Sequence, residues 1–442
     1  MNKTLLILLF CFNGFFSFAQ TLFSLKDCIK YAEQHSSEIK TSHVLSATTE
    51  LKLKQSINTY IPSISISSQN NLSTGRVLDP TTYQFLTNRS VYDMSTAVGG
   101  TMTLFSGFER PRTIQKDKLN LQSALIETEK IKNDLALNVT ALFLNLVLDK
   151  EAIRICENKI SMLLEQESVI EKRVEYNVST PGDLLNVQAD ITNAKVDLSS
   201  FVNQLNLDKV AMCELLEIDD WEAFDITTEV QQYEDVLPRL WNTSDVVASA
   251  YLLPQIKQSE LSIDIAKKEI SIASSAYWPT LKLNAGYGSA FSNARIKTSG
   301  EEYYFRDQLR DNASSYVTLS LNIPILSAIT VSNTVKQKKL ACERAGYELA
   351  RTKLALDKEV KQAIVNANTA YEKYTLLATD EQKCKEALRQ TKEKYDAGAE
   401  TYYDYQIAIG NLFQAQAQRL QAKYEYIFRT KIIEFYSGIS LY

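Results

Sequence analysis

Glycine and proline are scarce in this 442-residue chain, which has 13 glycines and 8 prolines. Both residues interrupt helices, so their scarcity favours long helices. Proline is absent from residues 112–180 and from residues 325–442. Each of these segments can contain one helix of roughly 70 residues, about 105 Å long at the usual rise per residue. No compact domain holds such a rod, and we therefore predict an elongated molecule.

A surplus of basic residues is also lacking. The chain has 48 Lys and Arg residues against 53 Asp and Glu residues, a net charge of −5, whereas nucleic-acid binding needs a basic surface. We expect no nucleic-acid partner. The two histidines, His35 and His43, are typical of a solvated helix face rather than of a metal site. HExxH, GxSxG and P-loop patterns are absent, and we predict no enzyme activity, no cofactor and no metal.

Cysteine pairs of the CxxC type are missing as well. Apart from Cys11 in the N-terminal segment, the cysteines are odd in number and widely scattered. This pattern argues against a disulfide framework and against a zinc site. These cysteines are Cys28, Cys156, Cys213, Cys342 and Cys384.

Residues 1–19 have the pattern of a cleaved secretory signal peptide. Lys3 precedes an apolar core, and a small-x-small cleavage site ends at Ala19. Cys11 follows Phe10 and so lacks the small preceding residue that lipoprotein processing requires. We expect export without a lipid anchor. No later segment has about 18 consecutive apolar residues, and no transmembrane helix is predicted.

Four segments alternate apolar and polar residues, the pattern of a β-strand with one apolar face. They lie at residues 63–67, 94–104, 281–287 and 314–326. In the last of them, Val317 and Leu319 flank Thr318. We expect each segment to belong to a strand of about ten residues, the length of a tilted strand that crosses a bilayer. Aromatic residues lie near the strand ends, where an interfacial girdle would place them. They are Tyr60, Tyr92, Phe105, Trp278 and Tyr316.

Four strands cannot close a membrane barrel, because the smallest such barrels have about eight. An open sheet edge that faces lipid leaves backbone groups unpaired, at several kcal/mol each. Strands in a membrane therefore predict a barrel shared between several chains. The alternative is a soluble four-stranded sheet covered by a protein core. The helices are poor covers, since their apolar seams face one another, and the shared barrel is favoured.

The same order of elements recurs about 220 residues apart, which indicates an internal repeat. Residues 20–223 contain a helical stretch, two strands, a long helix, a turn and a return helix, and residues 244–442 repeat this order. Residues 224–243 form the linker between the repeats. Apolar residues in both long helices follow alternating gaps of three and four, as in a coiled coil. Examples are Val139, Leu142 and Leu146, and Val360, Ala363 and Ala367.

A short turn ends each long helix. The breakers are Pro181 and Gly182 in the first turn and Gly398 in the second. Asp183 and Asp404 begin the return helices and are good N-terminal caps. Tyr176 and Tyr395 precede the turns, and their spacing to the two aspartates predicts a first turn two residues shorter than the second.

The chain resembles the TolC-like outer-membrane efflux proteins over essentially all of its mature sequence. The order of elements, given twice, is the hallmark of that family. Three motifs resemble the form that is common among Bacteroidetes-type bacteria. They are STGRVLDPTTYQF at residues 73–85, TLFSGFE at residues 103–109 and DLLNVQ at residues 183–188.

This resemblance implies a mainly α fold with a membrane β-barrel part. In a homotrimer, each chain would give four β-strands to a shared twelve-stranded barrel and its helices to a long coiled-coil α-barrel. Loops at residues 75–90 and 292–312 would face outside, and the acidic stretch at residues 217–241 would join an equatorial belt. Polar strand residues would line a water-filled interior. They include Ser63, Ser65, Thr318, Ser320 and Asn322.

The implied function is that of an outer-membrane channel, the exit duct of a tripartite efflux or type I secretion system. It would be a passive conduit that extends into the periplasm. Its partners would be outer-membrane lipid, a periplasmic adaptor protein and an inner-membrane pump. Drug efflux, metal efflux and protein secretion stay open, because in such systems the pump mostly selects the substrate.

In the family the tunnel narrows at the tip formed by the helix turns. By resemblance, Asp404 takes the position of an aspartate ring, and Tyr395 and Asp183 take the positions of a closing contact. Glu400 replaces the arginine that usually assists, so the closing salt bridge must be altered or missing. The turns match the adaptor-docking tip at Val178, Ser179, Ala397, Gly398 and Ala399. Helix capping also accounts for the two aspartates, and turn chemistry for the tip residues.

The main rival is a trimeric coiled-coil surface adhesin or structural stalk. It would share the heptads and the barrel strands. It would need neither helices that turn and come back nor a duplication. An adhesin would have its membrane strands only at the C-terminus, whereas this sequence has alternating segments in both halves.

Overall fold

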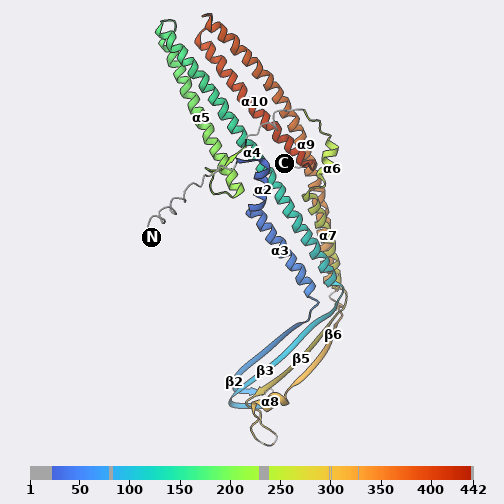
Figure 1. The fold of residues 1–442 in the computed structure, drawn as a ribbon. Coiled ribbons are helices and arrows are strands. Elements are labelled where there is room, and N and C mark those ends of the chain that lie inside the picture. The colour runs from blue at the N-terminus through green and yellow to red at the C-terminus, as the bar shows by residue number, and fades with distance from the viewer. Residues whose placement is uncertain are drawn as a thin grey trace, which may run out of the picture. The chain divides into compact units, whose positions relative to one another are not determined.

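The computed structural model describes residues 22–78, 83–227, 238–297, 299, 301–326 and 328–439 (Figure 1). The predicted signal peptide at residues 1–19 lies outside these residues. The helices are α2 (Leu25–His35), α3 (Ser37–Asn58), α4 (Glu109–Glu175), α5 (Pro181–Leu216), α6 (Thr243–Ala250), α7 (Pro254–Ser275), α8 (Phe305–Asp311), α9 (Ala328–Asp396) and α10 (Tyr402–Tyr436). The strands are β1 (Leu22–Phe23), β2 (Ser63–Leu78), β3 (Phe85–Ser106), β4 (Asp225–Ile226), β5 (Thr280–Ser292) and β6 (Ser314–Asn322).

The described residues fall into two compact units. The helical unit consists of the described residues within 1–43, 126–257 and 351–442. The strand unit consists of those within 44–125 and 258–350. Each unit takes segments from both halves of the chain, so each predicted repeat contributes to both units.

The two long helices are confirmed. α4 has 67 residues and α9 has 69, because no proline interrupts either segment. Of the predicted seam residues, Val139, Leu146 and Val360 are fully buried, whereas Leu142 is only half-buried. α4 also contains an 18-residue window that is apolar enough to cross a membrane by length and composition. Part of this apolar surface packs in the core of the helical unit, where Phe143 and Val147 are buried.

The start of the linker is part of the helical unit. Within it, β4 pairs in parallel with β1 at the start of the described chain. Phe224 and Ile226 are buried in the core of the helical unit together with residues of α2, α4 and α5. Asp225 lies 2.6 Å from Lys150 of α4 and 3.3 Å from Lys209 of α5, and the two ion pairs connect this segment to both helices. Residues 228–237 lie outside the described residues.

All four predicted strands are present in one antiparallel sheet of order β2-β3-β5-β6. The sheet pairs the two halves of the chain through β3 and β5, with Thr101 opposite Asn284. β2 and β3 are longer than the alternating pattern predicts and extend through residues 75–78 and 85–90. The predicted outer loop at residues 75–90 is therefore largely strand. The second predicted loop, at residues 292–312, contains the short helix α8.

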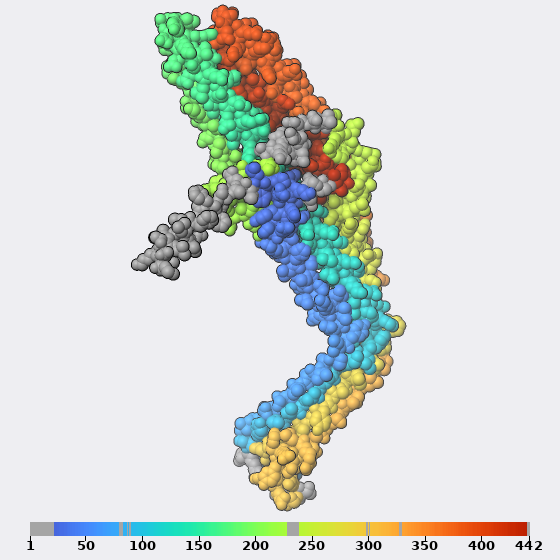
Figure 2. Space-filling model, viewed as in Figure 1, coloured from blue at the N-terminus to red at the C-terminus, as the bar shows by residue number. Residues whose placement is uncertain are grey.

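One face of this sheet is apolar and uncovered. Register places Ile66 opposite Val98 and Leu283 opposite Leu319. Ile66 is 75% exposed and Leu319 is 61% exposed. Figure 2 shows β2, β3 and β5 side by side, with no described helix over most of their length on the face in view. Tyr316 lies opposite Gly286 on the other, polar face, and its ring lies over this glycine. Tyr316 is thus not part of an aromatic girdle on the apolar face.

Candidate functional site

The two turns between the long helices and the return helices have the same hydrogen-bond pattern. The amide of Val178 donates to the carbonyl of Arg173 at 2.7 Å, and the amide of Ala399 donates to that of Lys394 at 2.8 Å. Left-handed residues stand at Asn177 (φ 59°) and at Gly398 (φ 75°). In both turns the donor amide stands five residues after the acceptor carbonyl and one residue after the left-handed residue, so the two turns have equal length. The prediction of a shorter first turn is wrong, because Tyr176 is not the counterpart of Tyr395; Val174 is.

Threonines, rather than the two aspartates, are the N-terminal caps of the return helices. The hydroxyl of Thr180 accepts from the amide of Asp183, and that of Thr401 accepts from the amide of Asp404. Each aspartate completes a capping box by accepting from the threonine amide, at 2.9 Å in the first turn and 3.2 Å in the second. The Thr401 hydroxyl, which donates to Asp404 at 2.6 Å, and then the Thr401 amide hold the pKa of Asp404 below its usual range. Its carboxylate is exposed and stays ionised.

Tyr395 is buried in a cluster of rings near the turns. Its ring stacks on Tyr405 with centroids 5.4 Å apart and lies edge-on to Tyr402 at 6.1 Å. The guanidinium of Arg173 lies 4.6 Å from the centroid of the Tyr395 ring. The hydroxyl of Tyr395 has no hydrogen-bond partner among the described residues. Asp183 is bonded to Thr180 in the same chain, so Tyr395 and Asp183 are not joined within one protomer.

Polar contacts connect the α4–α5 hairpin to the α9–α10 hairpin near these turns. Arg173 forms an ion pair with Asp396 at 3.3 Å. Farther along the return helices, the amide of Gln406 donates to Asp190 at 2.7 Å. Glu400, which stands where the family has an arginine, forms an ion pair with Lys394 at 2.7 Å within its own hairpin. The basic group that bridges the two hairpins is therefore Arg173.

The residues predicted for adaptor docking gather at the ends of the two hairpins. Val178 is 73% exposed, and Ala397, Gly398 and Ala399 form the second turn. Ser179 is half-buried and its amide donates to the carbonyl of Arg173 at 3.2 Å. Val178 thus places an apolar side chain at the exposed end of the first hairpin.

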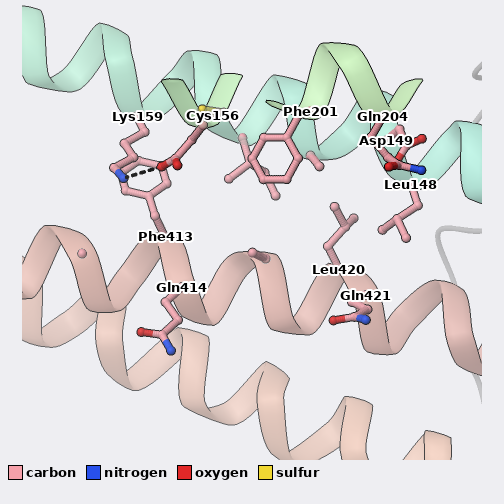
Figure 3. A pocket seen from close by; sticks show the side chains of 15 residues that line it. Leu148, Asp149, Cys156, Lys159, Phe201, Gln204, Phe413, Gln414, Leu420 and Gln421 are labelled. Carbon is pink, nitrogen blue, oxygen red and sulfur yellow. Dashed lines mark ion pairs between the residues drawn. The ribbon is translucent and has the colours of Figure 1, made fainter. Parts of the chain in front are cut away.

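Sequence reasoning missed a pocket of about 440 Å³ in the helical unit. Side chains of α4, α5 and α10 line it (Figure 3), with Phe201 in its middle and Phe413 beside Lys159. Lys159 and Asp197 form an ion pair at 3.8 Å. Asp149 is 9% exposed, and its Oδ2 atom has no hydrogen-bond partner among the described residues. Burial, and then the neighbouring Asp208, raise the pKa of Asp149 to about 7.

Comparisons with known proteins agree on one family. A family model described as outer membrane efflux protein matches residues 252–429. The outer membrane protein TolC of Vibrio cholerae is 28% identical over 195 residues, which cover 41% of this chain and 41% of that protein. TolC of Escherichia coli is 24% identical over 173 residues, 38% of this chain and 34% of the relative. The chain thus aligns with about two fifths or less of the length of these curated relatives.

Solved structures match over a larger share of the chain. CusC has a TM-score of 0.78 at 14% identity, with 94% of this chain and 92% of CusC covered. VceC of Vibrio cholerae has a TM-score of 0.75 at 13% identity, with 95% and 97% covered. At such identities the likeness concerns the fold. The chain is similar to outer membrane efflux proteins over residues 252–429, and its fold is similar to those of CusC and VceC over almost its whole length.

The order of elements disfavours the adhesin, because both halves of the described chain contain strands followed by a helix that turns back. The structure also gives a reason for the TLFSGFE motif. Gly107 and Phe108, which connect β3 to α4, both have left-handed backbone conformations, with φ of 62° and 65°. The motif thus encodes the sharp change from strand to helix in a TolC-like chain.

Proposed function

We propose that the chain forms an outer-membrane channel, the exit duct of a tripartite efflux or type I secretion system. The observation that carries this proposal is the exposed apolar face of the four-stranded sheet. Residues such as Ile64 and Val317, 73% and 76% exposed, would be unfavourable in water over so wide a surface. In a membrane the same face meets lipid.

Closure of the sheet requires further copies of the chain. β2 and β6 are edge strands, each paired on one side only among the described strands. Unpaired backbone groups at membrane depth cost several kcal/mol each. Three copies would join edge to edge into a twelve-stranded barrel, in which β6 of one copy pairs with β2 of the next. The long hairpins of the three copies would then form the α-barrel around a common axis.

In this proposal the duct is passive and has no enzyme activity. The polar face of the sheet would line the pore, and the hairpin ends would dock onto a periplasmic adaptor that connects to an inner-membrane pump. Asp404 would form the constriction ring. Because Asp183 and Tyr395 are not joined within one protomer, their closing contact would lie between neighbouring copies. Arg173 would supply the positive charge that Glu400 does not.

Purification of the mature protein and reconstitution into planar lipid bilayers would test this function. A detergent-dependent trimer with discrete conductance steps is expected. A water-soluble monomer without conductance would contradict the proposal. A deletion strain assayed for drug sensitivity, metal sensitivity and secreted proteins would then assign the substrate class.

Asp404→Asn is expected to weaken block of the channel by divalent cations. The amide keeps an oxygen that can accept from the Thr401 amide, so the capping box is retained while the negative charge is lost. A ring of three carboxylates attracts divalent cations strongly, and its removal should raise the blocking concentration about tenfold or more. Single-channel recordings at increasing magnesium concentration measure this effect.

Thr401→Ala is the matched control, because it removes the cap and keeps the charge of Asp404. It should lower helix stability by about 1 kcal/mol and leave the divalent block in place. Equal block by divalent cations in the wild type and in Asp404→Asn would mean that Asp404 acts only in helix capping.

A further inference from the structure

The polar face of the sheet contains a single basic residue near the end where the strands join the helices. Register places Lys282 of β5 between Thr103 of β3 and Ser320 of β6. The same face continues with Asn284, which accepts a hydrogen bond from the hydroxyl of Thr101 at 3.0 Å. The neighbours of Lys282 along this face are therefore uncharged hydroxyl and amide groups.

Charges are few in the four strands, and they are unequally distributed. The other charged strand residues are Arg76, Arg89 and Asp93. All three belong to the part of the β2–β3 hairpin toward its connecting loop, where Asp93 lies opposite Ser292 at the far end of β5. Lys282 is exposed, and no ion pair is found for it within the described residues. Its charge is thus uncompensated at its own level of the sheet.

A second basic group contacts the strand opposite Lys282. Arg110, in the first turn of α4, donates from Nη1 to the carbonyl of Thr103 at 2.6 Å, and Thr103 is the residue opposite Lys282. Its guanidinium also lies 5.2 Å from the ring centroid of Tyr60. Lys282 and Arg110 thus place two basic groups at this end of the sheet, and Glu109 is the acidic residue of the same helix turn.

We propose that Lys282 raises the permeability of the channel to anions relative to cations at the point where solutes pass from the helices into the barrel. The inference rests on the proposed function, because only a closed barrel turns the polar face inward and repeats the residue around the pore. Three copies would form a ring of three ammonium groups. At a distance of about one Debye length from the pore axis, such a ring changes the local ratio of anions to cations by about twofold to fourfold. The favoured solutes would bear carboxylate, phosphate or sulfate groups.

Lys282→Gln is the direct test, because it keeps a polar side chain of similar length and removes the charge. Reversal potentials in planar bilayers under a potassium chloride gradient give the permeability ratio of chloride to potassium. This ratio is expected to fall about twofold to fourfold in Lys282→Gln and further in Lys282→Glu. Lys282→Arg keeps the charge at an exposed position and should retain the wild-type ratio.

The outcomes separate this inference from the proposed function. A wild-type protein that forms no conductance overturns both. Wild-type and variant channels with equal permeability ratios overturn the role of Lys282 and leave the channel function intact. A ratio that falls equally in Lys282→Arg and Lys282→Gln also overturns it, since the effect would then follow side-chain shape rather than charge.

Discussion

Gly107→Ala is expected to abolish most of the assembled protein in the outer membrane. Gly107 has φ of 62°, a left-handed conformation that costs an alanine about 1–2 kcal/mol. A Cβ atom at this position would lie 2.3 Å from the carbonyl oxygen of Ser275 and 2.7 Å from Cβ of Trp278. The first of these atoms belongs to the backbone and the second is bonded to it, so neither can move away by a side-chain rotation. Such overpacking adds about 1–3 kcal/mol, a large share of the stability of a typical fold.

The yield of trimer from outer-membrane extracts and the urea midpoint of unfolding measure this effect. Gly346→Ala is the matched control, because Gly346 lies inside α9 and a Cβ there would meet nothing within 4 Å in the same chain. Alanine is the better helix former by about 1 kcal/mol, so this variant should be as stable as the wild type or slightly more stable. A Gly107→Ala protein with wild-type yield and midpoint would contradict the strand-to-helix geometry.

The regular elements could be predicted from the sequence because their periods are unambiguous. The alternation in residues 314–322 fits only a strand, and the structure has β6 there. The absence of proline predicts α4 and α9 almost to their ends. In both cases one local pattern repeats over many residues. The same segments show no competing pattern, so the local preference and the tertiary contacts agree.

The parts that sequence reasoning missed lack such a repeated signal. β2 continues past residues 69–71, where Gln69, Asn70 and Asn71 put polar groups on both faces, so the alternation ends before the strand does. α8 is too short to show a helical period. The buried side chain of Gln308 fixes it by bonding both the amide and the carbonyl of Ser292, at 3.0 and 2.9 Å. Contacts of this kind become visible only in three dimensions.

At the candidate site, the turns and the aspartates could be identified from the sequence. Which residues of the two turns are equivalent could not be identified in this way. The misalignment arose from two tyrosines, Tyr176 and Tyr395, that stand at different positions of equivalent turns. Only the hydrogen-bond pattern shows that Asn177 is the counterpart of Gly398, because asparagine also tolerates a left-handed backbone. The bridge from Arg173 to Asp396 joins residues 223 positions apart, and no local pattern predicts it.

The pocket in the helical unit leads to the second large effect, a stability that falls as the pH rises. Asp149 has a pKa of about 7 in the folded chain, raised first by burial and then by Asp208. In the unfolded chain an aspartate has a pKa of about 4. The folded state therefore binds the proton more tightly, and Asp149 destabilises the fold progressively as the pH rises from about 4 through 7. Above pH 7 the full cost of the buried charge is present.

Asp149→Asn is expected to remove this cost and to flatten the pH dependence. Near pH 3 the wild-type carboxyl is mostly protonated in both states, so the variant and the wild type should melt at similar temperatures. At pH 8 the variant should melt about 2–4 °C higher, because an amide can be buried without ionisation. Thermal unfolding of the detergent-solubilised protein, followed by circular dichroism at several pH values, measures the difference.

Asp197→Asn is the control from the same pocket, since Asp197 is exposed and lies 3.8 Å from Lys159. Its neutralisation removes an attraction and should not raise the melting temperature at any pH. Asp208→Asn removes the second cause of the raised pKa and should give part of the gain of Asp149→Asn at pH 8. If Asp149→Asn instead melts lower than the wild type at pH 8, the ionised carboxylate stabilises the fold. A basic group of the assembled channel must then contact Asp149.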